Sequence, residues 1–211
     1  MSNSQRIPHQ PFLVVLSAPS GAGKTSICKA VLRRDHGLAY SVSVTTRARR
    51  KGERNGHSYY YVSPAEFQRL VERGELLEHA QVYDTWYGTP KKPLLRYFRN
   101  GKDVIADLDV QGMRSCRREL PGTVSIFIMA PSRTELQRRL RSRGSESAAA
   151  MLRRQAELDR ELAAIPEFDY LVVNRKFSKA VEDVLAIIRS ERLRTSRRLP
   201  LVEKKEKGGI L

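Results

Sequence analysis

Short apolar runs alternate with helical patterns along most of the chain. The first apolar run covers residues 12–17, and a helix pattern follows over residues 24–34 with Ile27, Ala30 and Val31 on one side. Later strand candidates and helix patterns alternate in the same way, at residues 103–109, 111–120, 123–130, 133–141, 170–174 and 179–194. Apolar, β-rich runs separated by helices predict an α/β fold with a parallel sheet covered on both faces.

Two stretches depart from this rhythm. Residues 41–93 hold short aromatic segments, one helix pattern near 64–73 and turn signals, which predicts an α+β insertion on the sheet core. Residues 143–160 are charged and helical in propensity, which favours a short lid. The predicted domain spans 12–195 between a flexible start and a basic, flexible tail, with these parts: 1–11, core 12–40, 94–142 and 161–195, and tail 196–211.

Length and composition are typical of a single-domain protein without a membrane span or disulfide bonds. A chain of 211 residues with 40% hydrophobic side chains is long enough for one good core. We find neither an apolar run of about 18 residues nor the apolar centre of a secretory signal, so we expect a soluble, cytoplasmic protein. Cys28 and Cys116 are far apart and lack metal-ligand spacing, so we expect reduced core thiols.

The formal net charge of +16 favours an anionic partner, either nucleic acid or nucleotide phosphates. Much of the excess lies in Arg-rich stretches at 47–54 and 138–154 and in the tail from residue 189 to 207. A run of charges is usually a solvated face, so charge alone does not choose between the two partners.

A phosphate-binding loop follows the first predicted strand and opens the first predicted helix. Its pattern is G-x-x-x-x-G-K-[ST] with Ala in the first position. We expect Gly21 and Gly23 to let backbone N–H groups face phosphate oxygens, Lys24 to reach the β and γ phosphates, and Thr25 to bind Mg²⁺. The predicted ATP-binding loop comprises Ala18, Pro19, Ser20, Gly21, Ala22, Gly23, Lys24, Thr25 and Ser26. It indicates a nucleoside triphosphate and a metal, but no particular reaction.

Further motifs resemble the guanylate kinase family, in its bacterial form, in order and spacing. They are SVSVTTRARRKGERNGHSY from Ser41, then LLEHA, WYGT and DLDVQG, and the resemblance covers roughly residues 12–195. It implies transfer of the γ-phosphoryl group of ATP to GMP, and to dGMP, for guanine nucleotide synthesis and recycling. It also implies that ATP·Mg²⁺ and GMP bind on opposite sides of a cleft.

The resemblance assigns a GMP site to the insertion. Arg47, Arg50 and Tyr59 match the residues that grip the GMP phosphate, a task that suits guanidinium forks and a phenolic hydroxyl. An ordinary basic hairpin is the alternative interpretation of these residues.

The base-reading positions follow from the same resemblance. Glu78 and Asp107 match the carboxylates that accept hydrogen bonds from guanine N1–H and the 2-amino group. The hydroxyls of Ser43 and Thr89 match those near O6, and Tyr87 matches a further GMP contact. Adenine presents the opposite donors and acceptors and would leave the carboxylates unpaired.

Catalysis is expected to rest on Lys24 and three lid arginines, Arg139, Arg143 and Arg154, which would neutralise charge during transfer. A solvated helix face is the alternative for any one arginine. Asp109, together with Thr25, is the expected metal position through water, and Asn174 matches an adenine-side position.

Two departures from the family pattern stand out. Arg49 replaces the proline of R-x-P-R, and the lid stretch 147–150 lacks the usual acidic residues. Neither removes a residue with a direct role in transfer.

Several other functions compete with this interpretation. A GTPase would use the D-x-x-G spacing of Asp109 to Gly112, but no Asn-Lys-x-Asp motif follows. A non-catalytic scaffold domain would lack the intact loop at Gly23, Lys24 and Thr25. A nucleic-acid-binding role is suggested only by the tail, and a kinase for another monophosphate is the nearest enzyme alternative. The oligomeric state stays open between monomer and homodimer, and we expect no membrane partner.

Overall fold

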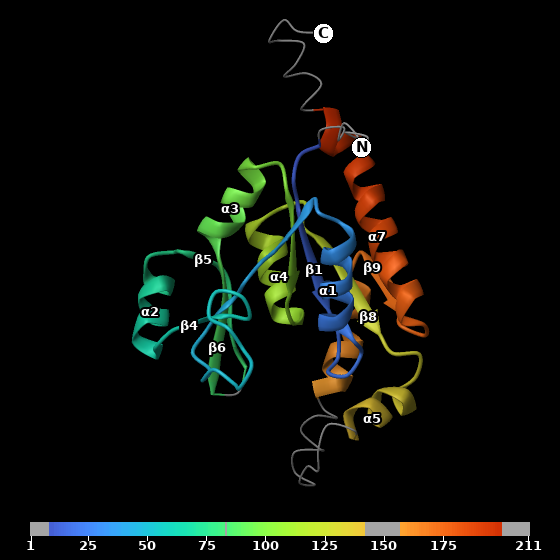
Figure 1. Cartoon of the computed structure of the whole chain (residues 1–211), viewed down its shortest axis with the longest axis horizontal. Coiled ribbons are helices and arrows are strands. Elements are labelled where there is room, and N and C mark those ends of the chain that lie inside the picture. Colours follow the sequence, from blue (N-terminus) through green and yellow to red (C-terminus); the bar gives the residue numbers. More distant parts are fainter. Residues whose placement is uncertain (1–8, 83, 142–156, 200–211) are drawn as a thin grey trace, which may run out of the picture.

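A five-stranded parallel sheet forms the centre of the molecule in this computed structural model, which describes residues 9–82, 84–141 and 157–199 (Figure 1). The strand order is β2-β7-β1-β8-β9. The strands are β1 (Leu13–Ser17), β2 (Leu38–Tyr40), β7 (Asp103–Asp107), β8 (Val124–Met129) and β9 (Tyr170–Val173). This sheet confirms the α/β class predicted from the alternating apolar runs.

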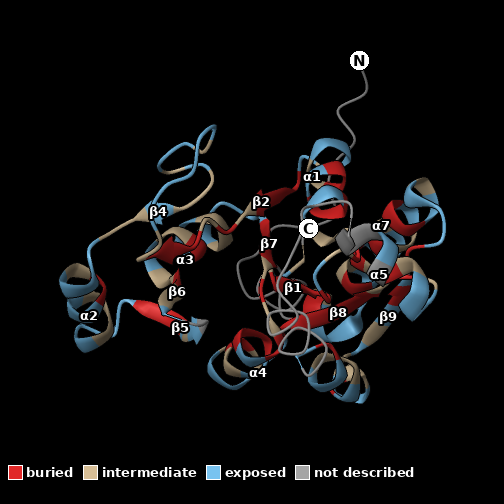
Figure 2. Ribbon diagram, turned by 90° about the horizontal axis from the view of Figure 1, so that it is seen from below, coloured by how far each residue is buried: buried red, intermediate tan, exposed pale blue. Residues whose placement is uncertain are grey.

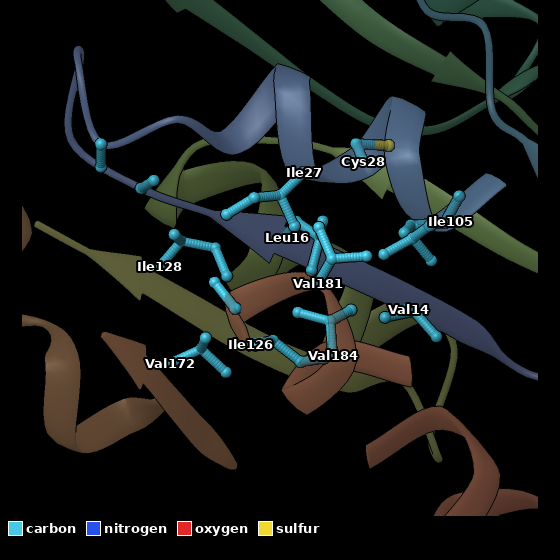
Figure 3. Packing of buried hydrophobic residues seen from close by; sticks show 14 of the residues in the cluster. Val14, Leu16, Ile27, Cys28, Ile105, Ile126, Ile128, Val172, Val181 and Val184 are labelled. Carbon is cyan, nitrogen blue, oxygen red and sulfur yellow. The ribbon is translucent and has the colours of Figure 1, made fainter. Parts of the chain in front are cut away.

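Side chains of β1 alternate between two hydrophobic cores. Val14 and Leu16 pack in one core with residues of α1 (Lys24–Arg34) and α7 (Phe177–Leu193) (Figure 3). Figure 2 colours the ribbon of β1 as buried. Leu13 and Val15 pack in the other core, against α3 (Lys91–Arg99) and α4 (Val110–Glu119). All five residues of β1 are buried, as expected for a central strand with helices on both faces.

A smaller, four-stranded sheet carries the insertion, with the order β4-β3-β6-β5. Its strands are β3 (Val44–Thr45), β4 (Tyr60–Tyr61), β5 (Leu76–Val82) and β6 (Thr85–Pro90). Helix α2 (Pro64–Glu72) begins after Ser63, whose side chain accepts a hydrogen bond from the Glu66 N–H at 3.1 Å. Phe67 of α2 packs with Val44 and Leu76 in a separate small core. The insertion therefore has apolar packing of its own.

Element bounds agree closely with the predicted patterns. The helix patterns at 24–34 and 133–141 coincide with α1 and with α5 (Arg133–Arg141), and the pattern at 179–194 corresponds to α7. Helix α3 and the short strand β2 had no separate prediction. A helix at 157–163 and η1 (Ile165–Glu167) lead into β9. Most of the predicted lid, including Arg143 and Arg154, lies outside the described residues.

The predicted tail boundary at residue 196 differs from the structure. Residues 195–199 are helical, and the Arg197 side chain is buried. Its guanidinium donates to Glu191 Oε2 at 3.1 Å and to the Gly122 carbonyl at 2.9 Å, and it lies 4.0 Å from the ring centroid of Phe12. The described part of the tail is therefore docked, because a cationic side chain finds a carboxylate, a carbonyl and an aromatic face together.

A second group of charges anchors α7 at the start of β7. Asp103 is fully buried and accepts hydrogen bonds from His9 at 2.8 Å and from Arg192 Nε at 2.7 Å. The other side of the Arg192 guanidinium donates to Asp35 at 2.6 Å. These hydrogen bonds and ion pairs offset the free-energy cost of burying the Asp103 carboxylate.

Both cysteines are free and buried, which confirms the prediction of core thiols. Burial raises the pKa of the Cys28 thiol to about 12, so this thiol stays protonated near neutral pH. Within the described ranges, no helix is long and apolar enough to cross a membrane.

Candidate active site

The predicted phosphate loop connects β1 to α1 and contains two glycines in the left-handed backbone conformation. Gly21 has φ +87° and Gly23 has φ +99°, both in the region that favours glycine. A Cβ added to Gly23 would lie 2.6 Å from Asn174 Nδ2, so this glycine is also required by close packing. The loop therefore opens onto the N-terminus of an eleven-residue helix, where backbone N–H groups attract anions.

Lys24 and Thr25, at the start of α1, both contact one aspartate at the end of β7. Lys24 Nζ lies 2.7 Å from Asp107 Oδ1 and donates to the Leu108 carbonyl at 2.9 Å. The Thr25 hydroxyl donates to Asp107 Oδ2 at 3.0 Å. Parallel pairing of β1 with β7 brings these groups together, because both strands end at the same edge of the sheet.

Asn174 supports the loop from the far side of the same edge. It follows β9, its side chain is buried, and its Nδ2 donates to the Ala22 carbonyl at 2.8 Å. This contact joins residues 152 positions apart in the sequence. The side chain that the sequence analysis predicted to lie on the adenine side thus donates a hydrogen bond to the phosphate loop.

Two carboxylates converge beside the start of α4. Asp109 is the N-cap of that helix and accepts the Gly112 N–H at 2.7 Å, while Glu78 on β5 is buried and accepts the Thr89 hydroxyl at 2.6 Å. A Cβ on Gly112 would lie 3.3 Å from Asp109 Oδ1 and 3.3 Å from Glu78 Oε2. Gly112 therefore leaves open the space between the two acids.

Burial shifts the protonation equilibrium of Glu78. It raises the pKa of Glu78 to about 7, the Thr89 hydrogen bond opposes that change, and the nearby Asp109 charge adds to it. Ser43, which precedes β3, is buried and belongs to the same insertion. Tyr87 lies on β6, opposite Thr45 of β3.

A third cluster surrounds Arg47, where the GMP phosphate is expected. Its Nη2 donates to Glu53 Oε1 at 2.7 Å, and its guanidinium carbon lies 5.3 Å from the ring centroid of Tyr59. The Tyr59 ring in turn lies 5.8 Å from the ring of Tyr87. Arg50 is exposed, and its backbone N–H donates to Glu53 Oε2 at 2.8 Å.

The sequence of the chain matches one protein family over most of its length. The family model described as guanylate kinase matches residues 10–191. The chain belongs to the guanylate kinase family. It is 43% identical to the guanylate kinase of Rhodospirillum rubrum over 93% of this chain and 91% of that one, and 44% identical to that of Alkalilimnicola ehrlichii over 90% and 94%.

A solved guanylate kinase supports the same assignment. The crystal structure of the enzyme from Anaplasma phagocytophilum superposes with a TM-score of 0.78 at 33% identity, covering 94% of this chain and 95% of that chain. The family and the α/β fold implied by the sequence motifs are thus confirmed.

Of the three arginines predicted to lie in a lid, only Arg139 falls within the described residues, on α5. The structure also brings in acidic residues that the sequence analysis did not select. Glu161, on the helix at 157–163, has a pKa raised to about 7 by burial and by Glu157, and the charges of Lys24 and Asp109 act on it too. Glu161 had no motif to mark it, because its helix reaches the phosphate loop only in the folded chain.

Proposed function

We propose that the chain transfers the γ-phosphoryl group of ATP to GMP, and to dGMP, giving ADP and the corresponding diphosphate. Membership of the guanylate kinase family makes it an enzyme of nucleotide phosphorylation. The observation that carries the proposal is the arrangement around the end of β7. Lys24 and Thr25 of the phosphate loop contact Asp107. The half-buried Asp109 and the buried Glu78 both lie beside Gly112. Guanine nucleotide synthesis and recycling in the cytoplasm is the role that we infer.

The two aspartates at the end of β7, Asp107 and Asp109, exchange the roles that the sequence motifs imply for them. Asp107, which contacts Lys24 and Thr25, is proposed to serve the phosphates and metal. Asp109, which shares the space beside Gly112 with Glu78, is proposed to read guanine. Each assignment rests on the nearest neighbours of the carboxylate.

Guanine is favoured over adenine by the acceptors on this side of the site. Guanine offers N1–H and 2-amino donors along one edge, and Glu78 with Asp109 supplies carboxylate acceptors for them. Adenine offers an acceptor at N1 and would leave a buried carboxylate unpaired. Ser43 and Thr89 are proposed to lie near O6, where a hydroxyl can donate.

Mg²⁺ fits the residues beside the phosphate loop. The Thr25 hydroxyl and the Asp107 carboxylate, 3.0 Å apart, are the hard oxygen donors that this cation prefers. When bound with ATP it would neutralise charge on the β and γ phosphates.

Transfer requires positioning and neutralisation rather than a general base. Lys24 is proposed to move from its contact with Asp107 to the phosphates when ATP binds. Arg139, Arg143 and Arg154 are proposed to close over the triphosphate and exclude water, a competing nucleophile. On the acceptor side, Arg47, Arg50, Tyr59 and Tyr87 are proposed to hold the GMP phosphate.

A direct test measures ADP formation from ATP·Mg²⁺ with GMP, dGMP, AMP, UMP and CMP as acceptors. We expect turnover with the two guanine nucleotides that exceeds the others by at least about 100-fold, the range a mismatched buried polar group produces. Equal turnover with AMP would overturn the base assignment, and ADP formation without any acceptor would indicate a hydrolase.

A further inference from the structure

Glu53 is an acidic residue in the cluster around Arg47, where the GMP phosphate is expected, and the proposed mechanism gives it no role. Its Oε1 accepts from Arg47 Nη2 at 2.7 Å, while its Oε2 accepts from the Arg50 N–H at 2.8 Å and from the Tyr61 hydroxyl at 2.7 Å. Arg49, at the position of the family proline, donates to the Glu53 carbonyl at 3.4 Å. One carboxylate thus joins two points of the segment between β3 and β4 to Tyr61 of β4.

Arg47 is held on several sides at once. Besides Glu53, its Nη1 donates to the Ala48 carbonyl at 2.8 Å, and the rings of Tyr59 and Tyr61 lie 5.3 Å and 5.9 Å from its guanidinium carbon. The Arg47 and Glu53 side chains are only 15% and 22% exposed. A guanidinium has five N–H donors, so the bonds to Glu53 and Ala48 leave further donors for a phosphate.

An acid beside a phosphate site has two opposite consequences. It repels the phosphate and competes for the arginine, or it fixes the arginine in place so that binding costs less ordering. The contacts favour the second consequence, because the charge of Glu53 is directed at Arg47, Arg50 and Tyr61 together. These donors lower the pKa of Glu53 to about 2, so the carboxylate stays ionised at any working pH.

We propose that Glu53 is a positioning residue for the GMP phosphate, which holds the Arg47 guanidinium in its binding orientation before the nucleotide arrives. The inference rests on the proposed function, since it names the partner of an arginine in that site. Glu53 itself need not touch GMP. Its effect is confined to the phosphate end, because Glu78 and Asp109 at the base end receive no hydrogen bond from this cluster.

The test compares two ligands by calorimetry, GMP and guanosine, which differ only in the phosphate. Glu53→Gln keeps the shape of the side chain but removes its charge. We expect its Kd for GMP to rise about 3- to 10-fold, the range for ordering one long side chain, with an unchanged Kd for guanosine. Tyr61→Phe, which removes one donor to Glu53, should shift GMP binding in the same direction by less. Glu66→Gln is the matched control and should leave both constants unchanged, because Glu66 is a half-buried acid of α2 in the same insertion and pairs with Arg69 at 3.2 Å.

The outcomes separate the two proposals. Tighter GMP binding by Glu53→Gln would mean that Glu53 competes with the phosphate, and unchanged binding would remove it from the site. Equal weakening of GMP and guanosine would mean that the substitution damages the whole insertion. Each of these results overturns the positioning role while leaving the proposed function intact. Failure of the unaltered enzyme to bind GMP would instead refute the function.

Discussion

Replacing Glu78 with glutamine should stabilise the fold and weaken GMP binding at the same time. The unfolded chain ionises Glu78 near 4.5, whereas burial raises the pKa in the folded protein to about 7. Between these values the folded state binds more protons than the unfolded state, so stability falls as pH rises from 4.5 to 7 and is level above that. The difference of about 2.5 in pKa corresponds to at most about 3 kcal/mol of lost stability at pH 8.

Glutamine does not ionise, so the Glu78→Gln variant should not lose stability as the pH rises through this range. We expect the variant to be more stable than the unaltered protein by about 1–3 kcal/mol at pH 8, and by less than about 1 kcal/mol at pH 5. GMP binding should weaken by about 1–3 kcal/mol at pH 8, because an amide donor faces a guanine donor in a buried site. In the unaltered enzyme, GMP affinity should fall as pH drops below about 7, since the protonated Glu78 no longer accepts from guanine.

Urea denaturation at pH 5 and pH 8, together with calorimetry of GMP binding, measures both effects. Glu75→Gln is the control, because Glu75 is exposed and pairs only weakly with Arg73, at 3.4 Å. Glu161, with a pKa also near 7, contributes its own pH dependence, so the informative quantity is the difference between each variant and the unaltered protein. A Glu78→Gln protein with the parental pH slope, or with parental GMP affinity, would refute the reasoning.

The remaining predictions concern the phosphate loop and the two acids. Lys24→Ala should lower turnover on the order of 100- to 1000-fold with little change in thermal denaturation, and normal turnover would remove this lysine from the mechanism. Gly112→Ala should raise the KM for GMP through about 1–3 kcal/mol of overpacking and leave the KM for ATP unchanged. Equal effects on both KM values would contradict the proposal that guanine binds beside Gly112. Gly23→Ala should destabilise the fold by more than Gly52→Ala, measured in urea, because both have positive φ but only Gly23 faces Asn174. Equal losses of stability in the two variants would mean that the Asn174 side chain moves aside without cost.

Long periodic segments were predictable because their apolar residues alone determine which face is buried. The bounds of α1 and α5 follow the pattern, and the phosphate loop was recognised from local sequence. Local pattern did not distinguish the roles that we propose for Asp107 and Asp109. They stand two residues apart at a strand end, and only the register of β1 against β7 shows that Asp107 lies beside Lys24.

Features that depend on distant partners were not predictable. Arg197 belongs to a Lys- and Arg-rich stretch that is typical of a flexible tail, and its burial depends on Glu191, Gly122 and Phe12. Glu53 lies in a basic stretch, and the sequence pattern did not mark it as part of a site. Its significance follows from three donors that meet only when β3 and β4 are paired.

The docking of residues 192–197 has a consequence for synthesis of the chain on the ribosome. The backbone N–H of Gln10 donates to the Arg197 carbonyl at 2.8 Å, and the flank of β1 receives Arg197 on Phe12, while Arg192 neutralises Asp103. Arg192 and Arg197 are synthesised long after Phe12 and Asp103. Until these two arginines have left the ribosome, the Phe12 ring lacks its guanidinium contact and the Asp103 carboxylate lacks its Arg192 hydrogen bond, so this flank of β1 closes late during folding.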